Sequence, residues 1–583
     1  MKQGVIFTYL RKHWLAYLLG VIMLAAVDYY NLIIPQITGQ ITDGLSAKIL
    51  SMDMVWALII DFLTMVIVVT IGRVLYRFFI FGSCRRVETE IRNDLFSKLE
   101  TLSQNYFNAN KTGDLMSNFT NDIDALRNAM GPAVVSSFDA VVMTLMTLYK
   151  MVSYVSLKLT LVTLIPMSII ACMSLYFCKE EEKRYYNKQK AFGKLSDMVQ
   201  ESYSGIRVIK AFIQEKKQDA YFELKNKDAY DANLKVTRLM AFFWPFLEFV
   251  IGVSYVITIV YGGYLAITGE ITLGRFVAFC QYTNMLIWPM MALGDAINCF
   301  SQGLAASKRI KSIFDEEPEI KDDERTDYSI DSLNGDIEFS HLSFRYRKDL
   351  PLALADLNIK IKKGETLAIL GKTGSGKTTV VNLLTRLYSS EDNMIKLDGH
   401  NINSIPLKLL RESISYVPQD NYLFSDTIEN NVKFGNLNAS HDEVVEVCKQ
   451  AEVHDNIIDF PEGYETMVGE RGVTLSGGQK QRTSIARALL KKASILILDD
   501  SLSAVDTDTE DNILANLKKH HSDKTVIMIA HRVSTIRNAD HILVLDKGET
   551  LEYGTFDELM ALNGTFKAMY DKQQLEKQLA MQG

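Results

Sequence analysis

The chain has 583 residues, which is too long for a single hydrophobic core, so at least two domains are expected. Residues 1–320 contain nearly all the long apolar runs, yet they hold 32 of the 63 Lys and Arg residues and 29 of the 70 Asp and Glu residues. The net charge of −7 therefore comes from the C-terminal part, and no stretch has the basic concentration of a nucleic-acid-binding domain. The six cysteines form no CxxC pair, which indicates small apolar side chains rather than a disulfide framework.

Six apolar stretches are long enough, at about 20 residues each, to cross the hydrocarbon core of a bilayer. They are predicted at residues 14–34, 55–81, 133–155, 157–178, 241–267 and 273–300. The first is too long for a signal peptide and no small-residue cleavage site follows it, so we expect it to remain a membrane helix. The sequence therefore predicts a multi-pass, all-α membrane domain of six helices over residues 1–314.

The connections after the second and fourth predicted helices are long and rich in Lys and Arg. By the positive-inside rule they lie in the cytoplasm, as do both termini and the C-terminal domain of a cell-membrane protein. Neither connection contains proline and both have apolar residues at helical spacing, so the membrane helices are expected to continue through them. Each is interrupted once, near residues 107–122 and 202–212, and these tips either press on a cytoplasmic domain or are plain helical hairpins.

An acidic, loop-like stretch over residues 315–334 is predicted to be a linker. Beyond it, short β-rich runs such as Ile337–Phe339 and Thr366–Leu370 alternate with helical segments. This order predicts an α/β domain over residues 335–583.

A glycine-rich segment, Gly371–Thr378, follows a strand-like run and precedes a helix-like one, as a phosphate loop must. Its glycines allow backbone N–H groups to surround phosphates, and the helix N-terminus adds a favourable dipole. Lys377 is expected to reach the β- and γ-phosphates and the Thr378 hydroxyl to hold Mg²⁺, so ATP and Mg²⁺ are the predicted cofactors. The predicted nucleotide-binding residues here are Gly371, Lys372, Thr373, Gly374, Ser375, Gly376, Lys377, Thr378 and Thr379.

A second apolar run, Ile495–Leu498, ends in Asp499 and Asp500. Buried parallel strands have this pattern, with the acidic residues at the C-terminal end where ligands bind. Asp499 is expected to bind Mg²⁺ through water, and Asp500 lies where a carboxylate can orient an attacking water molecule.

Residues 475–479 read Leu-Ser-Gly-Gly-Gln and lead into a helix-like segment. With this signature the chain resembles the ABC transporter family, and other family elements follow the same order along the sequence. The resemblance implies that Tyr346 stacks on adenine, that Gln419 couples Mg²⁺ and γ-phosphate to the membrane domain, and that His531 contacts the γ-phosphate. It also implies that Ser503–Asp506 crosses to a partner domain, and Gly469–Gly472 is similar to a segment found in exporters.

Six membrane helices ahead of one ATP-binding domain is the exporter arrangement of this family, and the tips near Gly113 and Gly205 resemble its two coupling helices. In the family, each ATP lies between the phosphate loop of one chain and the signature of another. Ser476, Gly477, Gly478, Gln479 and Asp506 are therefore expected to serve a second half-transporter subunit.

One position departs from the family pattern, because most hydrolytically competent members have Glu where this chain has Asp500. The Asp side chain is one methylene shorter, and a misplacement on the order of 1 Å can lower a rate about a hundredfold. The chain resembles the Asp-bearing subunit of heterodimeric bacterial multidrug exporters. The hypothesis is a slow ATP site on this chain and a non-identical partner that carries the Glu.

Charged residues within predicted membrane helices are candidates for substrate contact. Glu248 follows an aromatic stretch that contains Trp244, and an acid beside aromatic rings suits a lipophilic cation. An ion pair or a water-lined kink between helices is the alternative.

The predicted function is ATP-driven export of lipophilic compounds, cationic if Glu248 contacts them, by alternating access. A lipid or peptide exporter on the same scaffold, or an ABC regulator or sensor, remains open. A soluble ABC ATPase that acts on DNA or ribosomes is excluded by the six spans and the absence of a basic patch.

Overall fold

The computed structural model describes residues 4–469, 475–530 and 532–582, so His531 and most of the Gly469–Gly472 segment lie outside the described residues. The chain forms two compact units. Unit 1 holds the described residues up to Thr101 together with Asn110–Glu316, and unit 2 holds Leu102–Ala109 together with the described residues from Glu317 on.

Unit 1 is helical and includes three short π-helical turns, η1, η2 and η3. Its elements are α1 (Val5–Lys12), α2 (Trp14–Asn31), α3 (Ile34–Ser46), α4 (Met52–Glu100), α6 (Thr112–Ser117), η1 (Asn118–Asp122), α7 (Ile123–Met130), α8 (Pro132–Phe138), η2 (Asp139–Met143), α9 (Thr144–Lys150), η3 (Met151–Val155), α10 (Leu157–Ser204), α11 (Ile206–Ala211), α12 (Glu215–Ile267), α13 (Leu273–Met285) and α14 (Ile287–Asp315).

The described part of the chain contains six helical stretches that are long and apolar enough to cross a membrane. They are Trp14–Ser46, Met52–Glu100, Thr112–Val155, Leu157–Ser204, Glu215–Ile267 and Leu273–Asp315. The six predicted spans are thus confirmed, and all six are longer than the about 20 residues that cross a bilayer core. The four that flank the two long connections continue as helix into them, as expected. Three of these helices have a hydroxyl side chain as N-cap that accepts a hydrogen bond from a backbone N–H of the first turn. The N-caps are Ser51 for α4, Ser156 for α10 and Thr272 for α13.

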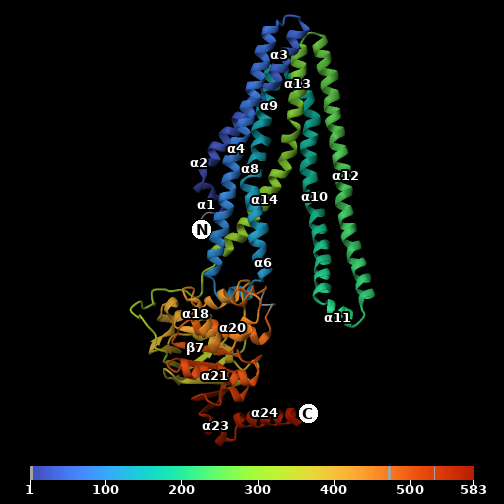
Figure 1. The fold of residues 1–583 in the computed structure, drawn as a ribbon. Coiled ribbons are helices and arrows are strands. Elements are labelled where there is room, and N and C mark those ends of the chain that lie inside the picture. The colour runs from blue at the N-terminus through green and yellow to red at the C-terminus, as the bar shows by residue number, and fades with distance from the viewer. Residues whose placement is uncertain (1–3, 470–474, 531, 583) are drawn as a thin grey trace. The chain divides into compact units, whose positions relative to one another are not determined.

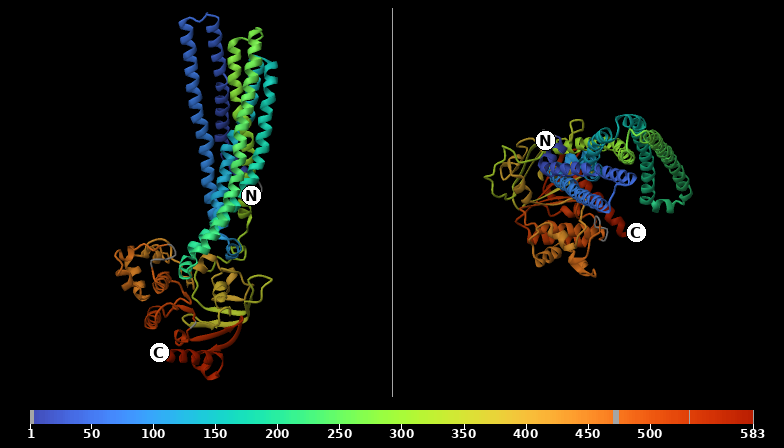
Figure 2. Two further views of the ribbon diagram at one scale, coloured as in Figure 1. Left: turned by 90° about the vertical axis from the view of Figure 1, so that its right-hand side faces the viewer. Right: turned by 90° about the horizontal axis from the view of Figure 1, so that it is seen from above.

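The helices α10 and α12 lie side by side as a hairpin, with α11 at its tip (Figure 1). The same pairing is visible from the two other directions in Figure 2. The tip around Gly205 that the sequence predicted is therefore a separate short helix between two long ones.

Buried charged side chains connect α4, α7 and α14 of unit 1, in the parts of these helices that lie beyond the apolar stretches. Arg309 of α14 makes a two-point contact with the buried carboxylate of Asp122 in η1, with an Nε–Oδ2 distance of 2.9 Å. Glu88 of α4 is also buried and binds Arg85 and Arg92 of its own helix and Arg127 of α7. Since removing one partner leaves a buried charge uncompensated, these contacts hold α4, α7 and α14 in one arrangement.

The helices α3 and α13 approach closely through two glycines. A Cβ on Gly39 would lie 2.7 Å from the carbonyl oxygen of Gly274, and a Cβ on Gly274 would overlap the carbonyl oxygen of Gly39. Asp43 of α3 accepts hydrogen bonds from the backbone N–H of Gly274 and from the Thr272 hydroxyl, each at 2.6 Å. Small residues that let backbones approach are typical of membrane helix interfaces.

Unit 2 is an α/β domain with two sheets, as predicted. The strands are β1 (Ile337–Phe344), β2 (Leu354–Ile361), β3 (Thr366–Gly371), β4 (Ile395–Leu397), β5 (His400–Asn401), β6 (Ile414–Val417), β7 (Ile495–Asp499), β8 (Thr525–Ile529), β9 (His541–Asp546) and β10 (Glu549–Gly554). The four-stranded sheet has the order β2-β1-β4-β5, and the six-stranded sheet has the order β10-β9-β3-β8-β7-β6. In the larger sheet only the β9–β10 pair is antiparallel.

Helices surround these sheets. They are α5 (Gln104–Ala109), α15 (Lys377–Leu384), η4 (Ile402–Ser404), α16 (Leu407–Glu412), α17 (Ile428–Lys433), α18 (His441–Gln450), α19 (His454–Ile458), η5 (Gly463–Glu465), α20 (Gly477–Leu490), α21 (Thr507–His520), α22 (Val533–Ile536), α23 (Phe556–Leu562) and α24 (Thr565–Gln582).

The larger sheet is buried on both faces. Along β3, Ile369 packs into the core shared with β1 and β2, whereas Ala368 and Leu370 pack into the core on the other side, under α20 and α21. This alternation explains why β3 and β7 read as continuous apolar runs in the sequence.

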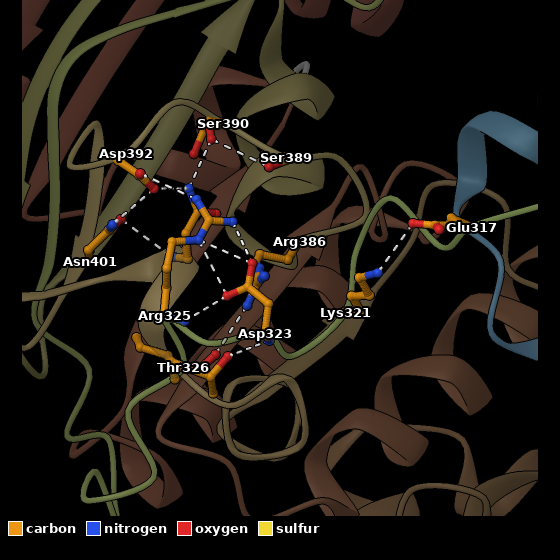
Figure 3. A network of polar contacts seen from close by, with 12 residues as sticks. Glu317, Lys321, Asp323, Arg325, Thr326, Arg386, Ser389, Ser390, Asp392 and Asn401 are labelled. Atoms are coloured by element: carbon orange, nitrogen blue, oxygen red, sulfur yellow. Dashed lines mark hydrogen bonds and ion pairs between the residues drawn. The ribbon is translucent and has the colours of Figure 1, made fainter.

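The predicted linker, residues 315–334, belongs to unit 2 from Glu317 onward, because its apolar residues are buried there. Ile330 and Leu333 lie in the same core as β1. Arg325 binds Asp323 at 2.7 Å and Asp392 at 3.4 Å, and Asn401 also donates to Asp392 (Figure 3). The segment is therefore attached to the domain by its buried apolar residues and by the ion pair between Arg325 and Asp392.

We predict that Gly274→Ala separates α3 from α13 and destabilises unit 1 by about 1–3 kcal/mol, the usual cost of overpacking. The matched control is Gly252→Ala in α12, because a Cβ at Gly252 has no neighbour within 4 Å. The thermal unfolding midpoint in detergent should fall for Gly274→Ala and stay level or rise for Gly252→Ala. Equal midpoints for the two variants would contradict the close approach.

Candidate functional site

The phosphate loop lies between β3 and α15, where its glycines take conformations that other residues rarely adopt. Gly374 has φ +82° and Gly376 has φ +102°. A Cβ on Gly376 would lie 2.5 Å from the carbonyl oxygen of Ala353, so a side chain is excluded by contact as well. Only glycine at these positions allows the chain to turn from the strand into the helix at this point.

The Lys377 amine folds back over this loop. Its Nζ donates to the carbonyl oxygens of Gly371 at 2.8 Å and Lys372 at 3.0 Å, and the side chain is buried. Burial lowers the pKa of the Lys377 amine, while the nearby carboxylates of Asp499 and Asp500 act in the opposite direction.

A cavity of about 300 Å³ opens beside the phosphate loop and gathers most of the predicted site. Its lining consists of Tyr346, Ala353, Thr373, Gly374, Gly376, Lys377, Thr378, Thr379, Gln419, Asp499, Asp500 and Ile529. These residues come from β1, β3, β6, β7 and β8 or from the segments that follow them. Gly371, Lys372 and Ser375 belong to the same loop but not to this lining.

The residues fit a phosphate-bearing ligand. Ser375 is 3% exposed, and its hydroxyl has no hydrogen-bond partner among the described residues. A Cβ on Gly374 would meet nothing within 4 Å, so the loop is open on that side. An unpaired buried hydroxyl beside an amine and a helix N-terminus suits an anion.

Next to Lys377, Thr378 and Asp499 form the polar end of the cavity. Asp499 is 1% exposed, and Tyr416 Oη donates to its carboxylate at 3.5 Å. Burial raises the pKa of the Asp499 carboxyl, whereas the nearby Thr378 hydroxyl acts in the opposite direction. A hydroxyl and a carboxylate at this position are oxygen ligands of the kind that Mg²⁺ takes beside phosphates.

Asp500 has an unusual backbone conformation, with φ +47°. Its N–H donates to the carbonyl oxygen of Ile529 at 2.9 Å, and its own carbonyl oxygen accepts from the hydroxyl of Ser503 at 2.9 Å and the Nε2 of Gln481 at 3.5 Å. Asp is among the residues that tolerate the left-handed region. The conformation is therefore held by contacts with the strand β8 and with the signature helix α20.

The signature residues have a structural role in α20 and lie apart from the cavity lining. Ser476 caps the helix by accepting from the N–H of Gln479, whose side chain in turn accepts from the N–H of Ser476. A Cβ on Gly478 would lie 3.0 Å from the carbonyl oxygen of Ala504, so the signature packs against the segment after β7. Asp506 caps α21 and is exposed.

Sequence reasoning missed several side chains that hold these segments together. Gln481 bonds to Ser503 at 3.2 Å and to the N–H of Ala504 at 2.9 Å. Glu510 is 2% exposed and binds both Arg532, at 3.1 Å, and the hydroxyl of Thr535. In the sequence Glu510 sits among polar residues of an amphipathic helix, so no local signal distinguishes it from a surface charge.

Glu248 and Trp244, the predicted substrate contacts, lie on α12 and are exposed in the single chain. Trp244 makes an edge contact with Phe243, and Phe242 stacks on Phe246 at 5.7 Å. Among the described residues, no ion pair involves Glu248. The structure therefore places both residues on an exposed face of unit 1 in the single chain.

Comparison with known proteins identifies the two units. Residues 17–290 match the family described as "ABC transporter transmembrane region", and residues 354–503 match the family described as "ABC transporter".

Relatives match along almost the whole chain. The "Probable multidrug resistance ABC transporter ATP-binding/permease protein YheI" of Bacillus subtilis (strain 168) is 38% identical and matches over 97% of both chains. The "ATP-dependent lipid A-core flippase" of Syntrophus aciditrophicus (strain SB) is 36% identical over 83% of this chain and 80% of that protein.

The fold agrees with a solved structure titled "Structure of a bacterial Atm1-family ABC exporter with ATP bound". That structure has a TM-score of 0.79 and 25% identity, and the match covers 97% of this chain and 98% of that one. With six membrane-spanning helices and one ATP-binding domain on a single chain, this protein belongs to the ABC transporter family and is an ATP-hydrolysing transporter of the exporter type.

Proposed function

We propose that this chain is one half of a dimeric exporter that moves lipophilic compounds out of the cytoplasm by alternating access. The observation that carries the proposal is the incomplete ATP site. The cavity gathers the phosphate loop, Gln419, Asp499 and Asp500, while Ser476–Gln479 lie outside its lining. A signature on a second chain would complete the site, and the signature of this chain would complete a site on its partner.

A partner chain is also supported by the tip of the α10–α12 hairpin. Its apolar side chains are highly exposed, with Tyr203 at 73%, Phe212 at 70% and Ile213 at 81%. We place this tip in the cytoplasm, together with both termini and unit 2, because the connections around it are rich in Lys and Arg. Lipid cannot cover an apolar cluster there, so a protein surface is the expected cover.

At the ATP site, backbone N–H groups of residues 372–376 and the Lys377 amine would bind the phosphates, and Tyr346 would stack on the base. Thr378, Gln419 and, through water, Asp499 would hold Mg²⁺, which supplies positive charge beside the phosphates. Asp500 orients the attacking water, and His531 is assigned to the γ-phosphate from its place in the family pattern. When two such ATP-binding units close on nucleotide, the membrane helices change conformation. This happens only if the open and closed conformations of the transporter bind nucleotide with different affinities.

The Asp500 carboxylate leads us to propose an asymmetric, heterodimeric pair. Its side chain is one methylene shorter than that of Glu. Its backbone is held by Ile529, Ser503 and Gln481, so the backbone cannot shift toward the ATP to make up for the missing methylene. The site on this chain is therefore slow, and the fast site combines the signature of this chain with a Glu-bearing partner.

A lipid substrate is the second candidate, because one relative that matches over most of its length is described as a lipid A-core flippase. A hydrophobic drug and a lipid tail present the same apolar chemistry to the membrane helices. The multidrug description of the relative that matches over 97% of both chains favours small lipophilic compounds.

The first test compares the chain alone with the chain co-expressed with its partner, in reconstituted vesicles. We expect the pair to hydrolyse ATP and to be stimulated by lipophilic cations, whereas the lone chain is nearly inactive. Full-rate hydrolysis by the lone chain would favour a homodimer in which Asp500 suffices. Hydrolysis by the pair without transport of any lipophilic probe would favour a regulator or sensor.

The asymmetric arrangement predicts unequal effects of two substitutions in the pair. Ser476→Ala removes a signature contact of the fast site and should abolish most ATP turnover. Asp500→Asn affects only the slow site and should reduce turnover much less. The steady-state ATPase rate at saturating ATP measures both, and a larger loss from Asp500→Asn would contradict the scheme.

If Glu248 pairs with a positive charge on the substrate, Glu248→Gln should lower transport of cationic dyes by about tenfold and leave neutral substrates unaffected, as for loss of a charge contact of about 1.4 kcal/mol. Glu223→Gln, on the same helix α12 but outside the predicted span, is the matched control and should change neither. Equal loss for cationic and neutral substrates would indicate a structural role for Glu248.

A further inference from the structure

The short helix α5 lies between two membrane helices in the chain, yet it folds with unit 2. It has two separate contacts there. Ser103 and Asn105 donate to the carboxylate of Glu319, at 3.1 Å and 2.8 Å. Asn108 donates through its Nδ2 to the hydroxyl of Tyr388 at 2.7 Å, and this second contact leads toward the nucleotide cavity.

Tyr388 is 7% exposed and belongs to a group of three aromatic rings behind the cavity wall. Its ring meets Tyr346 edge to face, with centroids 4.8 Å apart and planes at 86°. Phe344 meets Tyr346 in the same way, at 5.0 Å and 83°. Tyr346 lines the cavity, so Tyr388 and Phe344 fix from behind the ring that faces the ligand.

The hydroxyl of Tyr346 is fixed as well. It donates to the Thr379 hydroxyl at 3.0 Å and accepts from the Nδ2 of Asn382 at 3.3 Å. Both partners lie on α15, the helix that begins at the phosphate loop. The remaining freedom of the Tyr346 ring therefore depends on the edge contacts of Phe344 and Tyr388.

Asn108 is held in turn, because the Nε2 of Gln104 donates to its Oδ1 at 3.1 Å. The side-chain amide of Asn108 is thereby oriented with its NH₂ group toward Tyr388. A continuous set of contacts runs from α5 through Tyr388 to Tyr346 at the cavity.

We propose that Asn108 is a positioning residue for the base-binding ring: α5, by holding the Tyr388 hydroxyl, sets the affinity of Tyr346 for the nucleotide base. This inference rests on the proposed stacking of adenine on Tyr346. By thermodynamic reciprocity, binding of the base then strengthens the contact between α5 and unit 2. Occupancy of the base site is in this way communicated to a segment that continues directly into α4 and α6.

The test measures the affinity of the purified full-length transporter for ATP and for inorganic tripolyphosphate, which has phosphates but no base. Asn108→Ala and Tyr388→Phe should each weaken ATP binding by about three- to tenfold, the range for loss of one hydrogen bond. Tripolyphosphate affinity should stay unchanged. The double variant should be no weaker than either single one, because both remove the same contact.

Asn105→Ala is the matched control, since it removes the same side chain from the same helix but breaks the contact with Glu319. Its ATP affinity should equal that of the parent. An equal loss in Asn105→Ala, a parallel loss for tripolyphosphate, or no loss in Asn108→Ala would each overturn the inference. Tyr388→Phe retains the ring, and its thermal midpoint checks that the fold is intact.

A Tyr346→Ala arm separates this inference from the proposed function on which it rests. If Tyr346→Ala leaves ATP affinity unchanged, the base does not stack there and the proposed assignment of Tyr346 fails. If Tyr346→Ala weakens ATP binding while Asn108→Ala and Tyr388→Phe do not, only the link to α5 fails.

Discussion

The parallel pairing of β3 with its two neighbours is the constraint on which the ATP site depends. β3 lies in the middle of the larger sheet, between β8 and β9, and β7 and β6 follow on the β8 side. Because parallel strands end at one edge, the phosphate loop after β3, the carboxylates after β7 and the segments after β6 and β8 meet there. The strands are apolar on both faces and are packed between the cores under α15 and α20. This packing holds the strand ends, and with them the polar residues of the site, in place.

Backbone contacts at that edge restrain the residues expected to act on ATP. Asp500 has a left-handed conformation and is held by the carbonyl oxygen of Ile529 and by Gln481 of the signature helix. The same Gln481 reaches Ala504, against which Gly478 packs. The signature helix and the backbone of Asp500 are thus joined through a single glutamine. In a dimer in which each signature serves the opposite site, this contact would link the two sites within one subunit.

The boundary between the two units follows contacts rather than chain order. Leu102–Ala109 lies between membrane helices in the sequence and folds with the ATP-binding domain, and the acidic segment after Glu317 does so as well. In both cases a few polar contacts, such as Asn108 with Tyr388 and Arg325 with Asp392, accompany the change of unit. Because Leu102–Ala109 is continuous in the chain with the membrane helices on both sides, it joins the two units covalently.

The sequence alone determined the features whose residues are contiguous. Six apolar stretches predicted six membrane helices, the glycines of residues 371–376 predicted a phosphate loop, and the run ending at Asp499 predicted a buried strand. Each of these patterns arises from local physics: the thickness of a bilayer, the φ angles of glycine and the alternation of a strand.

Only the tertiary structure decided which distant residues meet. Asn108 and Tyr388 are 280 positions apart, and Glu510 and Arg532 are 22 positions apart with Arg532 outside α21, so no periodicity in the sequence relates them. The segment predicted as a linker shows the same limit, because Asp392, which pairs with Arg325, and the core around Ile330 come from residues far along the chain. Composition identified a polar segment, whereas its burial and pairing depend on long-range packing that a local pattern does not contain.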